Sequence, residues 1–497
     1  MDELHRYSLD EINTVLLEIE SELDLFERQA DGVYYWERVR HPIHKKVIKE
    51  VQRRHTVPTN SHNKNTSLDH EDRLSLLDKA RILKKGFENV YKGNPFLTRD
   101  CDVIFNTGPV PRRKLKDGTE YHLQLDPIAE AVEDSYAFLE PKGGPSQAPS
   151  ANRRFLTLPR TTVRVCKKLG YSYELPSEER NIVRILEKEI ESQVGVELDI
   201  VSMVENDLSS RRLLLPIYKK IIEQIDPKIC FTTYAHSQYS TFVEACSRYN
   251  IPVVDIQHCA VNRNYWAYHY PGERQRHVSA DYFFAWGKYW QDSVELPFSD
   301  NEIYVTGYPH FNTQKSRHKD VTQKNQILFL SNPNSGYSLS KFAAKFSKRV
   351  NDIYIIYKLH GAEFDTWKDD YPALATAAES GNIVVVDEIE GSLHQLLTES
   401  KVQVGVSTTA LYEGMSFGLP TFILDAPRAY EMEGVIERGY AMRVCEPNDI
   451  VSFLDAKHNM YSQSKNEFFE ENSLENVSNA IDEIASIESL DIVGMKQ

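Results

Sequence analysis

Apolar residues near the start of the chain recur every three or four positions, which is the spacing of one face of a helix. Ser8 and Glu11 match the capping box that begins many helices, and apolar positions follow on one side through residues 12–26. The pattern predicts an amphipathic helix with an acidic outer face. A second helical pattern covers 73–90, after a polar stretch at 56–70 that is typical of a loop.

Between residues 96 and 310, short apolar runs alternate with helical patterns. Short apolar runs bounded by turn residues are typical of buried strands, and strands separated by helices indicate a parallel sheet. We expect strands at 101–105, 229–233, 252–256 and 281–286, helices at 126–139, 177–193, 204–224 and 239–249, and a Pro/Gly/Ser loop at 141–151.

The second half of the chain repeats this alternation with six strands. A polar, charged connector at 312–325 separates the two halves. The order of strands and helices after it is that of a doubly wound domain. We expect its strands at 327–330, 353–357, 383–386, 402–406, 421–424 and 441–444, with helices that include 339–350 and 393–399, and a final helix at 474–487.

Composition excludes several classes of protein. The 497-residue chain carries a net charge of −15, which disfavours nucleic acid as the main partner because phosphate backbones are bound by clustered Lys and Arg. No apolar run is long enough to span a membrane and the first residues are acidic, so we expect a cytoplasmic protein. The six cysteines are scattered without a C-x-x-C pair, which indicates neither a zinc site nor a disulfide framework.

The stretch 402–424 carries the strongest chemical signal. Its strand pattern ends at Ser407, Thr408 and Thr409, and a short helical pattern follows. Hydroxyls at such a junction lie beside the unpaired N–H groups at the positive end of the helix, where phosphate binds. Glu413, one turn later on the same face, could accept hydrogen bonds from ribose hydroxyls. The alternative is structural, because Ser and Thr are ordinary N-caps and an early Glu compensates the helix dipole.

Three other strand ends are expected beside this junction. In the usual order of a doubly wound sheet, the first and fourth strands are neighbours where the winding reverses. The loop after the first strand holds Asn332 and Ser335. The second strand is followed by Lys358 and His360, and the third by Glu388, where a base could be bound. These groups together predict a site for a nucleotide monophosphate or diphosphate. Neither dinucleotide-binding nor P-loop glycine motifs occur.

Histidines follow the strands of the N-terminal half. His236 and His258 come just beyond strand ends, and Tyr268 and His269 lie in the aromatic loop that follows. Functional groups in parallel sheets gather at the carboxyl ends of strands, and His is the natural base near neutral pH. The alternative is that each of these histidines is structural.

A basic segment follows the first helix. Residues 38–55 hold seven Lys/Arg against one acid, Glu50, and Trp36 and Arg40 lie one helical turn apart. Such a segment can contact an anionic membrane surface or hold an acidic lipid-linked acceptor, with Trp36 and Arg40 as acceptor-binding groups. The alternative is a solvated helix face with a few ion pairs.

Several segments resemble the GT-B class of glycosyltransferases, in particular enzymes of bacterial and archaeal surface-polysaccharide and capsule synthesis. Two departures alter loop shape: Gly361 stands where the family usually has Pro, and Cys259 where it has Gly. The similar segments, which fall within residues 225–455, are IYVTGYPHF, YKLHGAEFDTW, GVSTTALYEGMSFGLPTFIL, the QHG-type loop DIQHCAVNRNYWAYHYP and the strand DYFFAWGKYW.

The resemblance implies an α/β fold in which two doubly wound, Rossmann-like parallel-sheet domains face a cleft. The expected divisions are an N-terminal helical extension at 1–95, an acceptor-side domain at 96–310, a nucleotide-sugar-binding domain at 311–455 and a helical tail at 456–497 that packs back across the junction. The implied reaction moves a sugar from a nucleotide-activated donor to a glycan or lipid-linked acceptor. The nucleotide sugar is a co-substrate, and neither a cofactor nor a metal is expected.

The same resemblance suggests roles for the candidate residues. His258 is the first candidate for the catalytic base and His236 the second. Tyr268 and His269 join Trp36 and Arg40 as candidates for binding the acceptor. Lys358, His360 and the hydroxyls of 407–409 would stabilise the leaving diphosphate. Three alternatives remain on this fold: a nucleotide-sugar 2-epimerase, a CDP-alditol phosphotransferase, and a non-catalytic scaffold that binds a nucleotide sugar.

Overall fold

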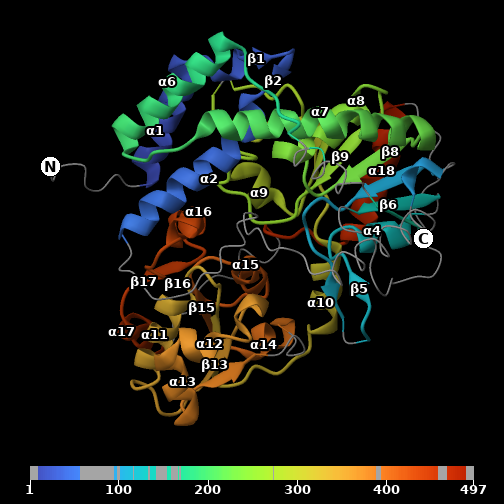
Figure 1. Ribbon diagram of the computed structural model, residues 1–497. Coiled ribbons are helices and arrows are strands. Elements are labelled where there is room, and N and C mark those ends of the chain that lie inside the picture. Colours follow the sequence, from blue (N-terminus) through green and yellow to red (C-terminus); the bar gives the residue numbers. More distant parts are fainter. Residues whose placement is uncertain are drawn as a thin grey trace, which may run out of the picture.

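The computed structural model contains two parallel sheets and a layer of N-terminal helices (Figure 1). The loops predicted at 56–70 and 141–151 and the helix predicted at 73–90 lie outside the residues that it describes. Those described residues are 9–55, 94–97, 101–115, 117–132, 135–140, 154–157, 166, 170–272, 274–387, 393–456 and 467–488.

The six strands predicted in the second half form one parallel sheet. Its order is β14-β13-β12-β15-β16-β17, so the first and fourth strands of the domain are neighbours, as predicted. The central strands are buried on both faces, which explains their continuous apolar runs. The strands are β12 (Gln326–Leu330), β13 (Tyr354–Lys358), β14 (Val384–Val386), β15 (Val402–Gly405), β16 (Thr421–Leu424) and β17 (Met442–Val444).

Helices connect these strands and cover the sheet. They are mostly short, and several begin with Pro at the first helical positions, where its missing N–H costs nothing. The helices are α11 (Gly336–Phe346), α12 (Trp367–Asp370), α13 (Pro372–Glu379), α14 (Leu393–Glu399), α15 (Thr409–Ser416), α16 (Glu433–Glu437) and α17 (Pro447–Asp455).

The N-terminal sheet has seven parallel strands in the order β11-β10-β9-β8-β3-β6-β7. It is also doubly wound, because the winding reverses between the neighbours β3 and β8. The strands are β3 (Val103–Asn106), β6 (Tyr136–Glu140), β7 (Arg154–Thr157), β8 (Ile229–Thr232), β9 (Val253–Ile256), β10 (Tyr282–Ala285) and β11 (Ile303–Val305). The helix that joins β8 to β9 is α8 (Ser240–Ser247).

The helix predicted at 126–139 is wrong in its second half. Helix α4 (Asp126–Ala131) ends early, and β6 then pairs with both β3 and β7. Four consecutive side chains of β6 are buried, and a short strand buried on both faces has no apolar alternation to distinguish it from a helix. Strand β7 has no counterpart among the predicted strands.

Two small elements lie between the domains. The hairpin of β4 (Arg113–Lys114) and β5 (Glu120–Tyr121) extends from the N-terminal domain toward the C-terminal one, beside α10 (Pro309–Arg317) (Figure 1). Helix α10 occupies the first half of the stretch predicted as a polar connector, because Phe311 anchors it in the core.

The N-terminal extension shares one apolar core with helices from the middle of the chain. Its helices are α1 (Leu9–Glu22) and α2 (Trp36–His55), and they pack with α6 (Ser177–Val194) and α7 (Ile200–Ile225). The short hairpin of β1 (Gln29–Ala30) and β2 (Val33–Tyr34) joins α1 to α2. Figure 1 shows α2 reaching down beside α16 of the C-terminal domain.

The C-terminal helix returns to the N-terminal domain. Helix α18 (Ser473–Ile487) buries Ile481 and Ile484 in a core that it shares with β3 and β8 (Figure 1). The preceding segment runs close against Gly287, where an added Cβ would lie 2.3 Å from the backbone O of Glu467. The chain therefore needs glycine there for space.

Candidate functional site

The loops after β12 and β15 are in contact, as the predicted strand order requires. Asn332 Nδ2 donates to the backbone O of Ser407 at 2.9 Å. Ser335 is buried at the start of α11, and its side chain makes no capping hydrogen bond. These loops lie at the reversal point of the sheet, where ligands of doubly wound domains bind.

The helix that follows β15 is not capped by its own hydroxyl. Thr408 occupies the N-cap of α15 with extended backbone, but its side chain makes no hydrogen bond to the amides of the helix. Thr408 and Thr409 are both partly exposed. The ordinary-cap alternative does not describe this helix, whose positive end receives no bond from its N-cap side chain.

Ser407 instead meets a carboxylate from the next loop. Its Oγ donates to Glu431, which follows β16. The same carboxylate accepts from Arg428, with Nε at 2.8 Å and Nη2 at 2.6 Å. The sequence pattern did not single out Arg428 or Glu431, because a polar turn after a strand is typical of solvated surface.

The second strand end presents a histidine in a fixed tautomer. The amide of Ala362 donates to Nδ1 of His360 at 3.2 Å, and the amide of His360 donates to Glu363 at 2.7 Å. Because Nδ1 accepts, the ring hydrogen of neutral His360 lies on Nε2 and can be donated. Burial lowers the pKa of His360. Lys358 lies on the same rim, with Nζ 5.1 Å from the ring of Phe364.

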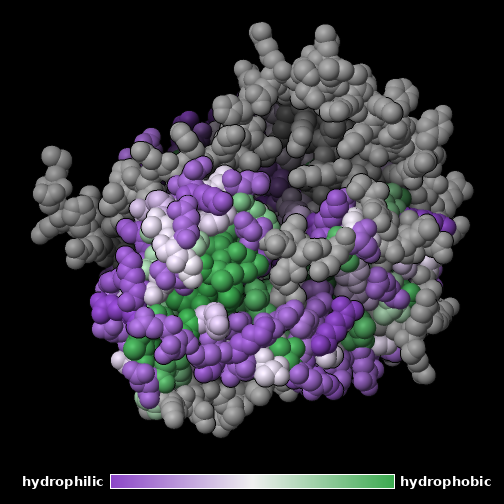
Figure 2. All heavy atoms as spheres, turned by 90° about the horizontal axis from the view of Figure 1, so that it is seen from below, coloured by the Kyte–Doolittle hydropathy of each residue, from purple (hydrophilic) through white to green (hydrophobic). Residues whose placement is uncertain are grey.

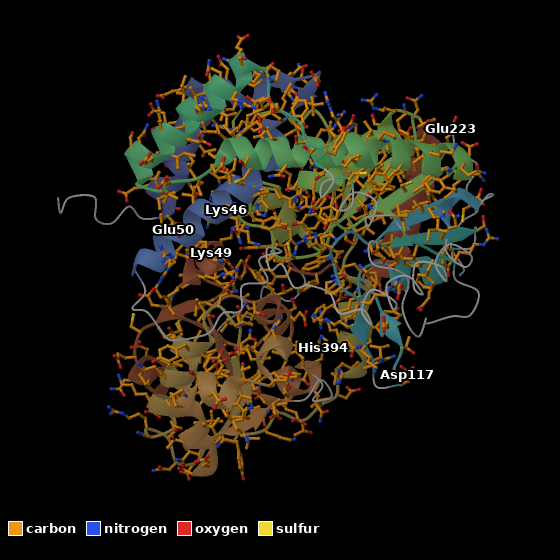
Figure 3. The ribbon with its side chains drawn as sticks, in the orientation of Figure 1. Lys46, Lys49, Glu50, Asp117, Glu223 and His394 are labelled. Atoms are coloured by element: carbon orange, nitrogen blue, oxygen red, sulfur yellow. The ribbon has the colours of Figure 1, made fainter. Side chains whose placement is uncertain are left out.

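Glu413 is paired with a histidine that the sequence analysis did not select. His394 Nε2 lies 2.9 Å from its carboxylate. Burial raises the pKa of Glu413, but the hydrogen bond and charge of His394 outweigh it, so the pKa is lowered overall. The positive charge of Arg113 lowers the pKa of both Glu413 and His360, which places the β4–β5 hairpin near this rim. Figure 3 shows His394 and hairpin residue Asp117 on the same side of the molecule.

The predicted donor residues that the structure describes follow neighbouring strands of the C-terminal sheet, and several contact a neighbour of their own. The pairing of Asn332 with Ser407 is direct, whereas Glu413 is held by His394. Glu388 lies outside the described residues. Among the described residues, no group of three or more His, Cys, Asp and Glu side chains could hold a metal ion.

A second group of side chains gathers at the strand ends of the N-terminal sheet. The hydroxyl of Tyr265 lies 3.4 Å from Nε2 of His258 and 3.4 Å from Nε2 of His236. His236 is buried, with Nδ1 3.2 Å from Ser237 Oγ, whereas His258 is partly exposed. Burial lowers the pKa of His258 to about 4 and also lowers the pKa of His236, so both rings are neutral at pH 7.

The Tyr265 hydroxyl has one hydrogen but lies beside two imidazole rings. Tyr265 can donate to only one ring, so the other ring must donate to Tyr265 for both contacts to be hydrogen bonds. Nδ1 of His258 is buried and has no partner among the described residues. An unpaired lone pair there costs less than an unpaired N–H, so the favoured arrangement puts hydrogen on Nε2 of His258. Tyr265 then donates to His236, which donates to Ser237.

His41 on α2 completes this group and was not predicted. Its ring lies 4.6 Å from that of Tyr265 and 5.5 Å from that of His236, measured between centroids. Burial lowers its pKa to about 3. Exposed Lys45, one turn later, also lowers the pKa of His41 and His236 by its charge. The sequence analysis read this helix as a basic surface segment, and for that reason it did not select His41, which faces inward.

Three of the predicted acceptor-binding residues are engaged inside the protein. Trp36 Nε1 donates to Glu20 at 3.0 Å, and Arg40 donates to the backbone oxygens of Trp266 at 2.8 Å and His269 at 2.7 Å. Tyr268 is fully buried. These contacts correct the expectation that Trp36, Arg40 and Tyr268 meet an acceptor, because their polar atoms already bond within the fold. His269 is partly exposed, and its role stays a prediction.

The loop that carries His258 and Tyr265 also touches the C-terminal domain. Asn262 Nδ2 donates to the backbone O of Glu431 at 3.3 Å, and Arg263 pairs with Glu437 at 3.3 Å. A cavity of about 90 Å³ lies at this contact. The histidine group and the loop that holds Ser407 are therefore joined through Glu431.

The basic segment divides into a buried and an exposed part. Arg38 and Arg40 are buried, whereas Lys45, Lys46, Lys49 and Arg53 are exposed on α2. Figure 3 labels Lys46 and Lys49 on this helix. Membrane or acidic-acceptor contact through 38–55 stays a prediction that rests on such exposed side chains. None of the described helices combines the length and apolar character needed to span a membrane.

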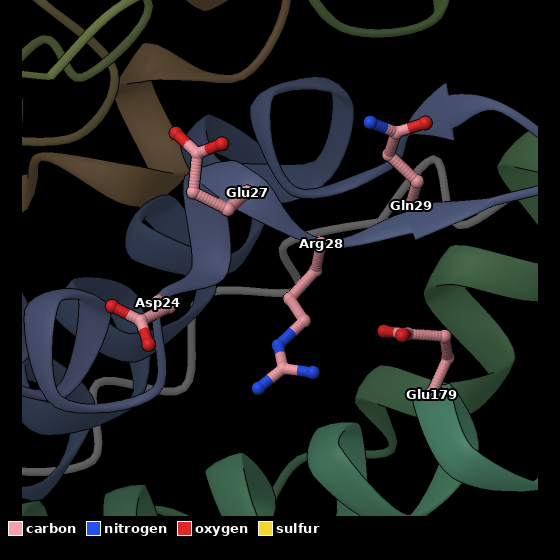
Figure 4. A pocket seen from close by; sticks show the side chains of 5 residues that line it. All are labelled: Asp24, Glu27, Arg28, Gln29 and Glu179. Atoms are coloured by element: carbon pink, nitrogen blue, oxygen red, sulfur yellow. The ribbon is translucent and has the colours of Figure 1, made fainter.

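Other surface features do not add to the site. An open depression on the N-terminal extension is lined by charged and amide side chains, with Arg28 between Asp24 and Glu179 (Figure 4). The face seen from below shows apolar areas among polar ones (Figure 2). Tyr354 and Val384, at the amino ends of their strands, are exposed large apolar residues of the C-terminal domain.

No family model and no curated protein matches the sequence. Solved structures that resemble this chain include the following three. They are the UDP-GlcNAc 2-epimerase of Methanocaldococcus jannaschii in complex with UDP-GlcNAc and UDP (14% identity, 77% of this chain and 99% of that one, TM-score 0.43), the wall teichoic acid polymerase TagF (10%, 83% and 95%, 0.43) and MurG of Acinetobacter baumannii (12%, 77% and 99%, 0.40).

All three TM-scores are below 0.5. Two doubly wound parallel sheets in one chain agree with the GT-B arrangement that the motifs implied.

Proposed function

We propose that the protein is a glycosyltransferase that moves a sugar from a nucleotide-activated donor to a glycan or lipid-linked acceptor. The C-terminal domain binds the nucleotide through Asn332, Ser407 and Glu413. The N-terminal domain holds the acceptor near His258, which acts as the base.

One observation supports this proposal most. A continuous chain of contacts runs from Asn332 through Ser407 and Glu431 to Asn262, which lies in the loop that carries His258 and Tyr265. A helix N-terminus, whose partial positive charge suits an anion, and a neutral histidine group thus share one junction between two domains. Transfer from a phosphate-bearing donor requires these two kinds of group side by side.

The chemistry follows from these groups. Transfer breaks the bond between the anomeric carbon and the donor phosphate oxygen and forms a bond from that carbon to the acceptor oxygen. His258 takes the proton that the acceptor hydroxyl loses, because its low pKa keeps the ring unprotonated at pH 7. The bonding electrons pass to the leaving phosphate, whose charge is stabilised by the Nε2–H of His360, by Lys358 and by the amides of α15.

A nucleotide screen followed by one substitution tests the proposal. We expect one nucleotide among UDP, GDP, CDP, CMP and dTDP to raise the melting temperature of the protein most, because ligands that bind only the folded state stabilise it. His258→Ala should retain nucleotide affinity and lose about 100-fold or more in turnover. The matched control is His277→Ala, because His277 stacks on Tyr34 and takes no part in the Tyr265 group.

The products separate the proposed reaction from its alternatives. A glycosyltransferase releases nucleotide only when acceptor is present. Isomerised sugar from donor alone would identify a 2-epimerase, and release of CMP from a CDP-alditol would identify a phosphotransferase. Full turnover by His258→Ala would remove His258 as the base, and no response to any nucleotide would overturn the proposal.

A further inference from the structure

Helix α2 is fixed against both loops that carry the histidine group. The side chain of Arg38 donates to two hydroxyls of α8, at 2.8 and 2.9 Å, just beyond the loop that holds His236. Arg40 donates to two backbone oxygens of the loop that carries Tyr265. These bonds hold the helix so that His41 faces the histidine group.

His41 is buried, yet its ring makes no hydrogen bond within the described part of the chain. The residue is only 8% exposed, and its ring lies 4.6 Å from that of Tyr265. Burial is the main cause of its lowered pKa, and nearby charges that include His258 add to it, so His41 lies close to the proposed base. A buried polar group without a protein partner is costly, and it indicates a partner outside the chain, such as water or a ligand.

Lys45 follows His41 by one helical turn on the same face of α2. It is exposed and forms no ion pair or hydrogen bond with the residues that the structure describes. Its charge nevertheless reaches the histidine group, because it adds to the effect of burial in lowering the pKa of both His41 and His236. An unpaired ammonium therefore lies beside a neutral imidazole that has an N–H to donate.

This pair of groups suits a phosphate. The ammonium supplies a point charge, the manner in which Lys commonly binds phosphate, and the ring N–H supplies a directed donor to a second oxygen. The two groups come from successive turns of one helix, so their spacing does not depend on how the two domains are arranged.

We propose that His41 and Lys45 bind a phosphate carried by the acceptor, next to the hydroxyl that His258 deprotonates. This inference rests on the proposed function, since it names the class of acceptor as a phosphate-bearing sugar or lipid. It also gives the N-terminal extension a role in the reaction, because α2 supplies both groups.

Inorganic phosphate tests the site without knowledge of the sugar. In the full chain with labelled histidine nitrogens, and with the nucleotide that binds best in the donor site, phosphate should shift the ring signals of His41 in a saturable manner. Lys45→Gln should weaken the apparent affinity about tenfold or more, because the charge that attracts the anion is lost. The signals that disappear in His41→Gln identify the ring.

Lys46→Gln is the matched control. Its position is rotated by about 100° from Lys45 around the helix. The pKa of Asp199 is lowered mainly by the hydrogen bond from Ser202, and the charge of Lys46 adds a smaller effect, so Lys46 lies toward the start of α7. Lys46→Gln should therefore leave the phosphate affinity unchanged. Both lysines are exposed, so calorimetry on these two variants still decides the question if His41→Gln does not fold.

Two further probes distinguish the sources of the phosphate. Glucose 6-phosphate carries it on a soluble sugar, and phosphatidylcholine vesicles that contain phosphatidic acid carry it on a lipid. Binding of either probe that Lys45→Gln weakens and Lys46→Gln preserves supports the inference and identifies the source.

No shift of the His41 signals with phosphate, or equal weakening by Lys45→Gln and Lys46→Gln, would overturn the inference while leaving the proposed function intact. Failure of the wild type to bind any nucleotide would overturn the proposed function and, with it, the assignment of the phosphate to an acceptor. The phosphate titration without nucleotide would then test the anion site by itself.

Discussion

A single hydroxyl hydrogen decides which nitrogen of His258 can act as a base. Tyr265 lies between the Nε2 atoms of His258 and His236, and it can donate to only one of them. If Tyr265 donates to His236, His258 carries its hydrogen on Nε2 and keeps the lone pair of Nδ1. That nitrogen is buried, so an acceptor must uncover it before His258 can take its proton. Tyr265 is then a positioning residue, because it acts on the substrate only through His258. Tyr234 and Cys259 also face this hydroxyl and influence its titration.

The substitution Tyr265→Phe tests this role. It keeps the ring that stacks on Tyr268 and removes the hydroxyl, so turnover should fall about tenfold or more while nucleotide affinity stays unchanged. Wild-type kcat/KM should rise with pH through about 4, because the base must lose its proton, and then remain level. Nitrogen NMR of the His258 ring should show the Nε2–H tautomer in wild type and a mixture in Tyr265→Phe. An unchanged tautomer and rate would make Tyr265 merely structural.

At the scale of elements, the return of the chain to the N-terminal domain depends on close backbone contacts. The amide of Tyr289 donates to the backbone O of Glu467 at 3.0 Å, and the indole of Trp290 donates to that of Phe468. Gly287 lies directly against this segment, and its extended φ of −170° would suit any residue. Space alone therefore requires glycine, since a Cβ would lie 2.3 Å from a carbonyl oxygen.

Gly287→Ala should therefore destabilise the protein by about 1–3 kcal/mol, because the backbone must shift to admit the methyl group. Urea unfolding measures the change. Gly361→Ala is the matched control, since nothing lies within 4 Å of its added Cβ. Equal stability of the two variants would mean that the 467–470 segment moves aside without cost.

At the scale of the whole molecule, buried and partly buried histidines link stability to pH. Burial lowers the pKa of His41 to about 3 and that of His258, His269 and His310 to about 4, against 6.5 when unfolded. The unfolded chain therefore binds more protons between pH 6.5 and 4, and stability falls as pH falls through this window. Buried Asp255 opposes the trend, because burial raises its pKa to about 7 and the folded state then binds the extra proton.

We expect the histidines to outweigh Asp255. The free energy of unfolding should fall by several kcal/mol from pH 7 to pH 4, at about 1.4 kcal/mol per histidine for each unit of pKa difference. Urea unfolding at intervals of one pH unit measures the slope. A free energy of unfolding that is level or rises toward pH 4 would contradict the burial of these neutral rings.

The sequence by itself determined the strands of the C-terminal domain, the junction at Ser407 and the histidines at the strand ends. These features depend on neighbours along the chain, since apolar runs, turn residues and helix caps act over a few positions. The order of the strands in the C-terminal sheet then followed from a general rule for doubly wound sheets. The same local signals failed at Tyr136–Glu140, where burial on both faces removes the alternation that marks a strand.

Only the tertiary structure decided what each polar group meets. Arg40 and Trp36 both donate hydrogen bonds to Glu20, and Arg40 also donates to the aromatic loop. Their polar groups therefore support the fold and are not available to a ligand. Ser407 meets Glu431, and Tyr265 joins two histidines from different strand ends. A side chain's partner can lie hundreds of positions away, and hydrogen bonding and burial depend on that partner. Residue type and spacing specify where a group sits on its own element, whereas packing between elements specifies its chemistry.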